Sequence, residues 1–167
     1  MREQKVMNNK GFSLVELIIV IAIMAILVGV LSPQLIRYVE KANVAADIQM
    51  ADGVRSAITF AMMDPSVINA TDSSASMIAT IAATGTAGTA LSYLNGTDTV
   101  FQEAVWETIG GGITDQASLL TQVRSARAAG GGITVAIPNS NSVSITIDGT
   151  DADGKKDTAS GTPIVVQ

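Results

Sequence analysis

Residues 12–36 form an apolar stretch of 25 residues that contains one charged side chain, Glu16. At ~1.5 Å per residue, a helix of this length measures about 37 Å, enough to cross a hydrocarbon core of roughly 30 Å. Arg2, Lys5 and Lys10 precede the stretch and place that end in the cytoplasm by the positive-inside tendency. We therefore expect a single-pass membrane helix, a cytoplasmic amino terminus and an extracytoplasmic remainder.

The helical pattern continues beyond Pro33, which is expected to bend the helix rather than end it. Between residues 37 and 63, apolar side chains recur every three or four positions and predict one buried stripe. The charged residues of this segment are assigned to its other faces, and Asp64-Pro65 is the predicted end. The expected helix has about 50 residues. Its stripe consists of Val44, Ile48, Ala51, Val54, Ile58, Ala61 and Met62; the charged residues are Arg37, Glu40, Lys41, Asp47, Asp52 and Arg55.

After residue 65 the patterns become short. Residues 76–83, 99–109 and 115–128 have helical patterns, with Phe101, Val105, Trp106, Ile109, Leu119, Leu120 and Val123 facing inward. Apolar residues then alternate over 133–137 and 143–147, which predicts an antiparallel hairpin, and 163–166 is expected to add a third strand. The predicted fold is α+β, with one long amino-terminal helix packed against a small antiparallel sheet.

Composition excludes several kinds of function. The chain has no cysteine and no histidine, so it lacks the residues of Cys or His nucleophiles, Ser-His-Asp triads and the common zinc sites. Its net charge is −5, and removal of residues 1–11 would leave 7 basic against 14 acidic residues, or −7. Such a surface repels nucleic acid and offers no basic patch to bind it. We expect a protein that is not an enzyme.

Glu16 is the candidate functional residue of the apolar stretch. An acidic group at the centre of a membrane helix costs roughly 2.5–3.5 kcal/mol, so such residues usually have a function and a partner. We expect Glu16 to lack that partner within its own chain. The alternative is a tolerated acid near the end of a signal anchor, with its carboxylate reaching the interface.

The sequence Gly11-Phe12-Ser13-Leu14-Val15-Glu16, together with the basic leader, the apolar stretch and Pro33, resembles the processing site of type IV pilins and the related pseudopilins. The resemblance implies a pilin fold and a membrane prepilin peptidase that cleaves between Gly11 and Phe12 and N-methylates Phe12. It divides the chain into a cleaved leader (1–11), a transmembrane and filament-core helix (12–36), its amphipathic continuation (37–63) and an extracytoplasmic head (64–167). Glu16 would then pair with the amine of a neighbouring Phe12, and Pro33 would let the helix bend during assembly.

This resemblance predicts a structural subunit of a type IV pilus that serves adhesion, motility or DNA uptake. Its partners would be copies of itself, other pilins, the prepilin peptidase, the pilus assembly machinery and the cytoplasmic membrane. The subunit would first span the membrane and then lie at the cell surface in the pilus. The alternatives are a pseudopilin of a secretion system and, from another class, a membrane-anchored surface binding protein.

Two features of the carboxy-terminal part remain. Many pilins close a loop there with a disulfide, and the absence of cysteine predicts a head without one. Asp148, Asp151, Asp153 and Asp157 form an oxygen-rich cluster that could hold calcium, although its spacing does not match an EF-hand. A solvated turn is the alternative that we favour, and no cofactor is expected.

Overall fold

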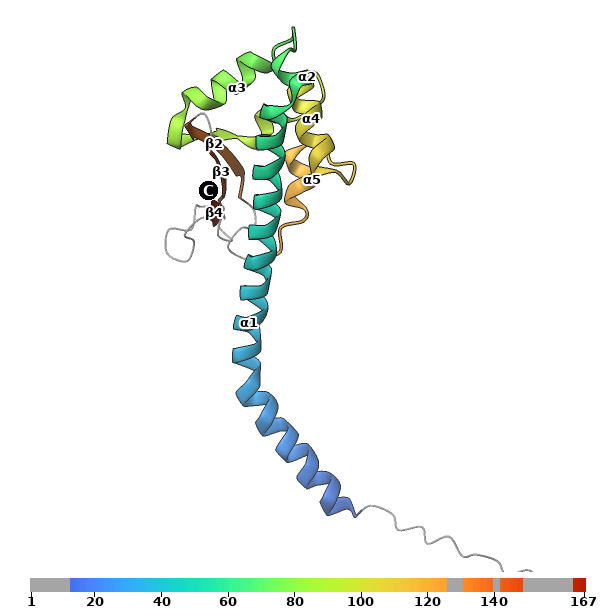
Figure 1. Ribbon diagram of the computed structural model, residues 1–167. Coiled ribbons are helices and arrows are strands. Elements are labelled where there is room, and N and C mark those ends of the chain that lie inside the picture. Colours follow the sequence, from blue (N-terminus) through green and yellow to red (C-terminus); the bar gives the residue numbers. More distant parts are fainter. Residues whose placement is uncertain (1–12, 126–130, 140–141, 149–163) are drawn as a thin grey trace, which may run out of the picture. The chain divides into compact units, whose positions relative to one another are not determined.

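The computed structural model describes residues 13–125, 131–139, 142–148 and 164–167. The chain divides into two compact units, residues 1–39 and residues 40–167. One long helix, a set of short helices and a small antiparallel sheet make up the described part (Figure 1). The predicted α+β class is confirmed.

Helix α1 (Leu14–Met63) has 50 residues and continues through Pro33, as the sequence predicted. It ends where expected because Asp64 is extended, with φ −68° and ψ 126°, and Pro65 occupies the first turn of the next helix, α2 (Pro65–Ile68). The Asp64 carboxylate accepts a hydrogen bond from the Ser66 N–H at 2.7 Å, which caps α2.

Four short helices follow α1 in the described part of the second unit. They are α2, α3 (Ser74–Ala83), α4 (Val100–Ile109) and α5 (Gln116–Leu120), with short 3₁₀ turns at Gly85–Ala87 and Leu91–Leu94. Helix α5 is shorter than the predicted 115–128. Gln122 N–H and Val123 N–H bond to carbonyls three residues back, and Asp47 binds the next two amides, so the chain leaves the helix there; residues 126–128 lie outside the described residues.

The sheet has the order β1-β2-β3-β4, and each neighbouring pair is antiparallel. β2 (Ile133–Asn139) and β3 (Ser142–Ile147) form the predicted hairpin, and β4 (Ile164–Val166) adds the predicted third strand. β1 (Thr89–Ala90) was not predicted, because two residues are too few for an alternating pattern. In β3 alternate side chains are buried, in agreement with the sequence; they are Val143, Ile145 and Ile147. In β2 the expected Ile133, Val135 and Ile137 are buried, but Ala136 is buried as well, at 6% exposure, so the alternation fails there.

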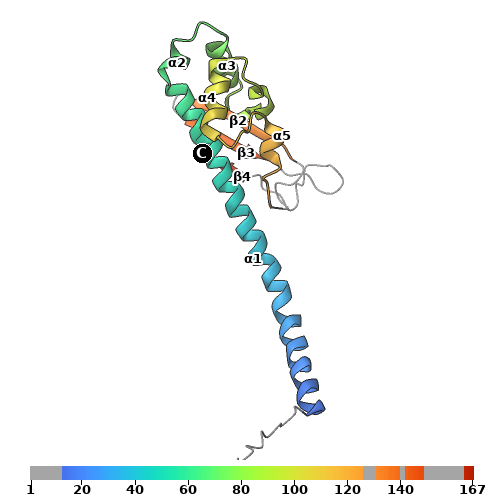
Figure 2. The same ribbon diagram turned by 90° about the vertical axis from the view of Figure 1, so that its right-hand side faces the viewer.

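The core of the second unit joins α1, the short helices and the sheet in one apolar cluster; both views show the later part of α1 running through this unit (Figures 1 and 2). Ala51, Val54 and Ile58 supply the α1 side, and Phe101 and Trp106 the α4 side. Two assignments on α1 were wrong. Ile48 is 44% exposed, while Asp47, which was assigned to another face, is 1% exposed.

Candidate functional site

Glu16 lies in the first turn of α1 and has a hydrogen-bond partner in its own chain. Its Oε2 accepts the backbone N–H of Ser13 at 2.9 Å, while the Ser13 carbonyl accepts the Leu17 N–H at 3.3 Å. A glutamate three residues after the residue that begins a helix forms one half of a capping box, and its charge is favourable at this end of the helix dipole. The Ser13 amide is a local hydrogen-bond partner that was not predicted, and because it is neutral, the pairing of Glu16 with a cationic amine stays a prediction.

A local signal could have revealed this contact. Ser13-Leu14-Val15-Glu16 has the spacing Ser-x-x-Glu, which marks the start of a helix when an apolar run follows. The cap leaves the carboxylate with further capacity, because two ionised oxygens offer about four acceptor positions. The bond therefore orients Glu16 and is compatible with a second partner.

The apolar side chains of the first unit have no cover from the described chain. Leu14 is 73% exposed and Ile26 is 67% exposed. The most apolar 18-residue window of α1 has a mean hydropathy of 3.1 and is 0% buried, and by length and composition it could cross a membrane. A helix that is apolar on all sides needs lipid or other protein around it.

The other residues singled out by the sequence differ in what the structure says of them. Pro33 lies inside α1, whereas Gly11 and Phe12, the predicted cleavage and methylation site, lie outside the described residues. Of the calcium candidates, Asp148 is described and Asp151, Asp153 and Asp157 are not. Within the described ranges, no three His, Cys, Asp or Glu side chains are grouped so that they could hold a metal ion; the calcium site stays a prediction.

Asp47 is a buried carboxylate that sequence reasoning missed. It accepts the backbone N–H groups of Arg124 and Ser125, each at 2.9 Å, and the Ser125 hydroxyl. These three donors satisfy a group whose burial would otherwise be costly. Asp47 therefore attaches the segment after α5 to the long helix, a contact that no local sequence pattern indicates.

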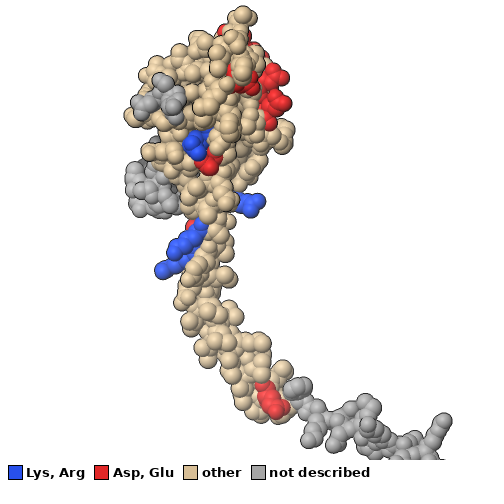
Figure 3. Space-filling view, viewed as in Figure 1, with Lys and Arg blue, Asp and Glu red and all other residues tan. Residues whose placement is uncertain are grey.

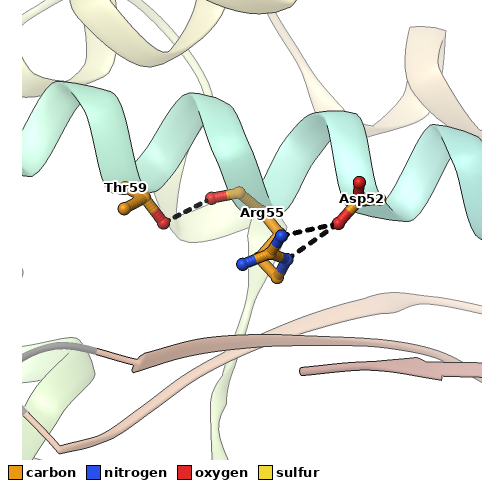
Figure 4. Close-up of polar contacts among 3 residues, drawn as sticks. All are labelled: Asp52, Arg55 and Thr59. Atoms are coloured by element: carbon orange, nitrogen blue, oxygen red, sulfur yellow. Dashed lines mark hydrogen bonds and ion pairs between the residues drawn. The ribbon is translucent and has the colours of Figure 1, made fainter.

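Asp52, a second carboxylate of the same helix, is bound by a residue of its own helix and not by a distant segment. Asp52 pairs with Arg55 one turn later at 2.8 Å, and the Thr59 hydroxyl donates to the Arg55 carbonyl at 2.8 Å (Figure 4). All three residues belong to α1, so this set supports the helix and does not connect it to another element. Because the Asp52–Arg55 ion pair is partly exposed, it contributes little to the stability of the fold.

The amino terminus of α4 is capped by residues from two segments. The Val100 N–H donates to Asp72 at 2.7 Å, the Phe101 N–H to the Ser74 hydroxyl at 3.0 Å, and the Gln102 N–H to the Thr99 hydroxyl at 3.2 Å. The Ser74 side chain, followed by the amides of Val100 and Ser74, lowers the pKa of Asp72 below its ordinary value of 3.8. The amides that a helix cannot satisfy itself are thus bound from outside.

Comparison with known proteins locates the similarity at the start of the chain. Residues 6–32 match the family described as "Prokaryotic N-terminal methylation motif", a range that includes Gly11, Phe12 and Glu16. Over 51 residues the chain is 48% identical to a type IV major pilin protein PilE1 of Neisseria gonorrhoeae, covering 30% of this chain and 31% of that protein. It is 47% identical over 51 residues to a fimbrial protein of Neisseria meningitidis serogroup B, with 30% of each chain covered.

The matched part thus spans about 30% of the length of these relatives, and no solved structure matches the chain. The resemblance to the type IV pilin family is confirmed over the amino-terminal region.

Proposed function

We propose that this chain, whose amino-terminal region resembles that of type IV pilins, is a structural subunit of a type IV pilus. The observation that carries the proposal is a coincidence of two features. The methylation motif covers residues 6–32, and the helix that it begins presents its apolar side chains uncovered. Lipid covers such a helix before assembly, and helices of other copies cover it afterwards.

Processing would precede assembly. A prepilin peptidase would cleave between Gly11 and Phe12 and methylate the new amine of Phe12. This cut lies before the apolar stretch, so the membrane anchor stays with the mature subunit. The subunit would hold its amino terminus on the cytoplasmic side, in line with the basic residues of the leader, and would reach the surface within the pilus.

Glu16 would receive its second partner at assembly. The Ser13 amide holds the carboxylate at the end of α1, and the cationic amine of a neighbouring Phe12 would pair with it. Removing an ion pair from water is costly unless its geometry and hydrogen bonds are good; the existing cap supplies one such bond beforehand. The pairing would fix the axial register between subunits.

Two substitutions separate the two roles of Glu16. Glu16→Gln keeps an acceptor for the Ser13 amide but removes the charge, whereas Glu16→Ala removes both. If charge pairing drives assembly, both variants insert and are cleaved, and both lose surface filaments, as measured by immunoblot of the sheared fraction. Normal filaments from Glu16→Gln would refute the pairing, and loss from Glu16→Ala alone would assign the residue to helix capping.

The unchanged chain tests the proposal itself. Mass spectrometry of the mature protein should find methylated Phe12 at its amino terminus, and electron microscopy should find filaments made of this chain. A mature protein that keeps residues 1–11 and stays monomeric would exclude the pilus subunit. Processing without abundant surface filaments would favour the pseudopilin.

A further inference from the structure

The outer face of α4 carries two carboxylates beside a hollow. Glu103 and Glu107 lie one helical turn apart, and both are exposed. Together with Ile113 and Trp106, of which Trp106 is only 3% exposed, they line a pocket of about 410 Å³. Acidic side chains gather over this part of the head in the space-filling view (Figure 3).

These two carboxylates have no cation beside them among the described residues. Asp52, by contrast, has a cationic partner in Arg55. Like charges four residues apart on a helix repel each other, so a cation placed between Glu103 and Glu107 would relieve that repulsion. A guanidinium is the best fit, because its planar fork of N–H groups binds carboxylates through two parallel hydrogen bonds.

The first unit supplies a cation of this kind. Among residues 13–39, Arg37 is the one basic side chain, and it is exposed. Its guanidinium makes no hydrogen bond or ion pair with the described residues.

We propose that the pocket between Glu103 and Glu107 receives Arg37 of a second copy of this chain. The inference rests on the proposed function, since it requires copies that polymerise. This contact joins two different surfaces, one from residues 1–39 of one copy and one from residues 40–167 of another, and is therefore heterologous. Heterologous contacts that do not close into a ring generate helical filaments. The opposite charges of the two surfaces make them complementary and favour this contact over contacts between like surfaces.

The contact would complement the one made by Glu16. Arg37 follows Glu16 by 21 positions, about 32 Å along a helix. The apolar segment of each subunit would therefore be held by a charge pair near each of its ends. Two fixed points define the stagger between neighbours, whereas apolar packing alone tolerates sliding.

A charge exchange tests this contact in cells that process and assemble the full chain. E103K/E107K should reduce sheared filaments by about tenfold or more, because like charges would then face each other. R37E should do the same, and R37E combined with E103K/E107K should restore the yield to within about threefold of the unchanged chain, since the charge complementarity returns. Membrane levels of cleaved subunit and the melting of the detergent-extracted chain serve to exclude misfolding.

The matched control replaces another exposed arginine, Arg124, with glutamate. R124E should not rescue E103K/E107K; rescue by R124E would overturn the assignment to Arg37. Unimpaired filaments from E103K/E107K, or no recovery in the combined variant, would also overturn it. If any of these results is obtained while the unchanged chain still forms filaments, the Arg37 contact is refuted and the proposed function stands. If the unchanged chain forms no filaments, both the proposed function and the contact are refuted.

Discussion

Asp47 and Ser125 lie 78 positions apart in the chain, yet the Asp47 carboxylate accepts both the backbone N–H and the hydroxyl of Ser125. With the Arg124 amide, these bonds hold the end of the α5 segment against α1. The segment that precedes the sheet thus depends on one acidic side chain in the middle of the long helix.

Asp47→Ala should lower the free energy of unfolding by about 2–4 kcal/mol, because it leaves buried donors without an acceptor. Unfolding of the detergent-extracted full chain in guanidinium, followed by the fluorescence of the single tryptophan, Trp106, measures the change. Asp52→Ala is the control; it breaks only a partly exposed pair and should cost less than about 1 kcal/mol. Equal losses in the two variants would contradict the role given to Asp47.

Asp72 makes the α4 cap sensitive to acid. Its hydrogen bonds lower the pKa of its carboxyl group in the folded protein, so its contribution to stability is present above the ordinary value of 3.8 and is lost as the pH falls through the lowered pKa. Asp72→Asn should therefore melt below the wild type at neutral pH. The gap between their melting temperatures should narrow in acid below about pH 4.

Melting of both proteins across that range by circular dichroism provides the measurement. Asp64, whose pKa is also lowered by its bonds to Ser66, is present in both and contributes equally. A gap that stays constant down to about pH 2 would show that the charge of Asp72 does not act through the cap.

Gly88 permits the close approach of β1 to β2. Its φ is +71°, and a Cβ there would lie 2.5 Å from Thr134 Cγ2 and 2.9 Å from the Val135 carbonyl oxygen. Gly88→Ala should cost about 2–3 kcal/mol, since this backbone region is nearly restricted to glycine and the neighbours are close. Gly53→Ala meets nothing within 4 Å in α1 and should stabilise the helix by about 0.5–1 kcal/mol; an unchanged or raised melting temperature for Gly88→Ala would refute the steric argument.

Thr99 closes the capping box of α4 with Gln102. Thr99→Val keeps the volume but removes the hydroxyl that accepts the Gln102 amide, and should cost about 1 kcal/mol. Thr108→Ala, on the exposed face of the same helix, should change stability by less than about 0.5 kcal/mol. Chemical unfolding of the two variants side by side would show no difference if the cap were unimportant.

Periodicity predicted the elements whose residues repeat over a long stretch. The apolar pattern of α1 gave its length and its end at Met63, and alternation gave the β2–β3 hairpin. It failed where one long-range contact decides the structure. The apolar pattern predicted Ile48 inside and Asp47 outside, whereas three donors from a distant segment make burial of the acid favourable.

In the candidate site too, local sequence patterns were predictive and contacts between distant segments were not. The motif around Gly11, Phe12 and Glu16 could be read from the residues, and the comparisons locate the same region. The bond between Ser13 and Glu16 was not predicted, although the spacing Ser-x-x-Glu before an apolar run is typical of the start of a helix. The pocket beside Glu103 and Glu107 requires two segments to meet in space, which no local pattern predicts.

The lack of cysteine has a mechanical consequence when it is combined with the Asp47 contact. In a fibre of such subunits, tension on the head would load hydrogen bonds and packed side chains with no covalent cross-link to arrest extension. Reducing agents would leave its tensile strength unchanged, and the hydrogen bonds between Asp47 and Ser125 would be among the contacts that carry the load.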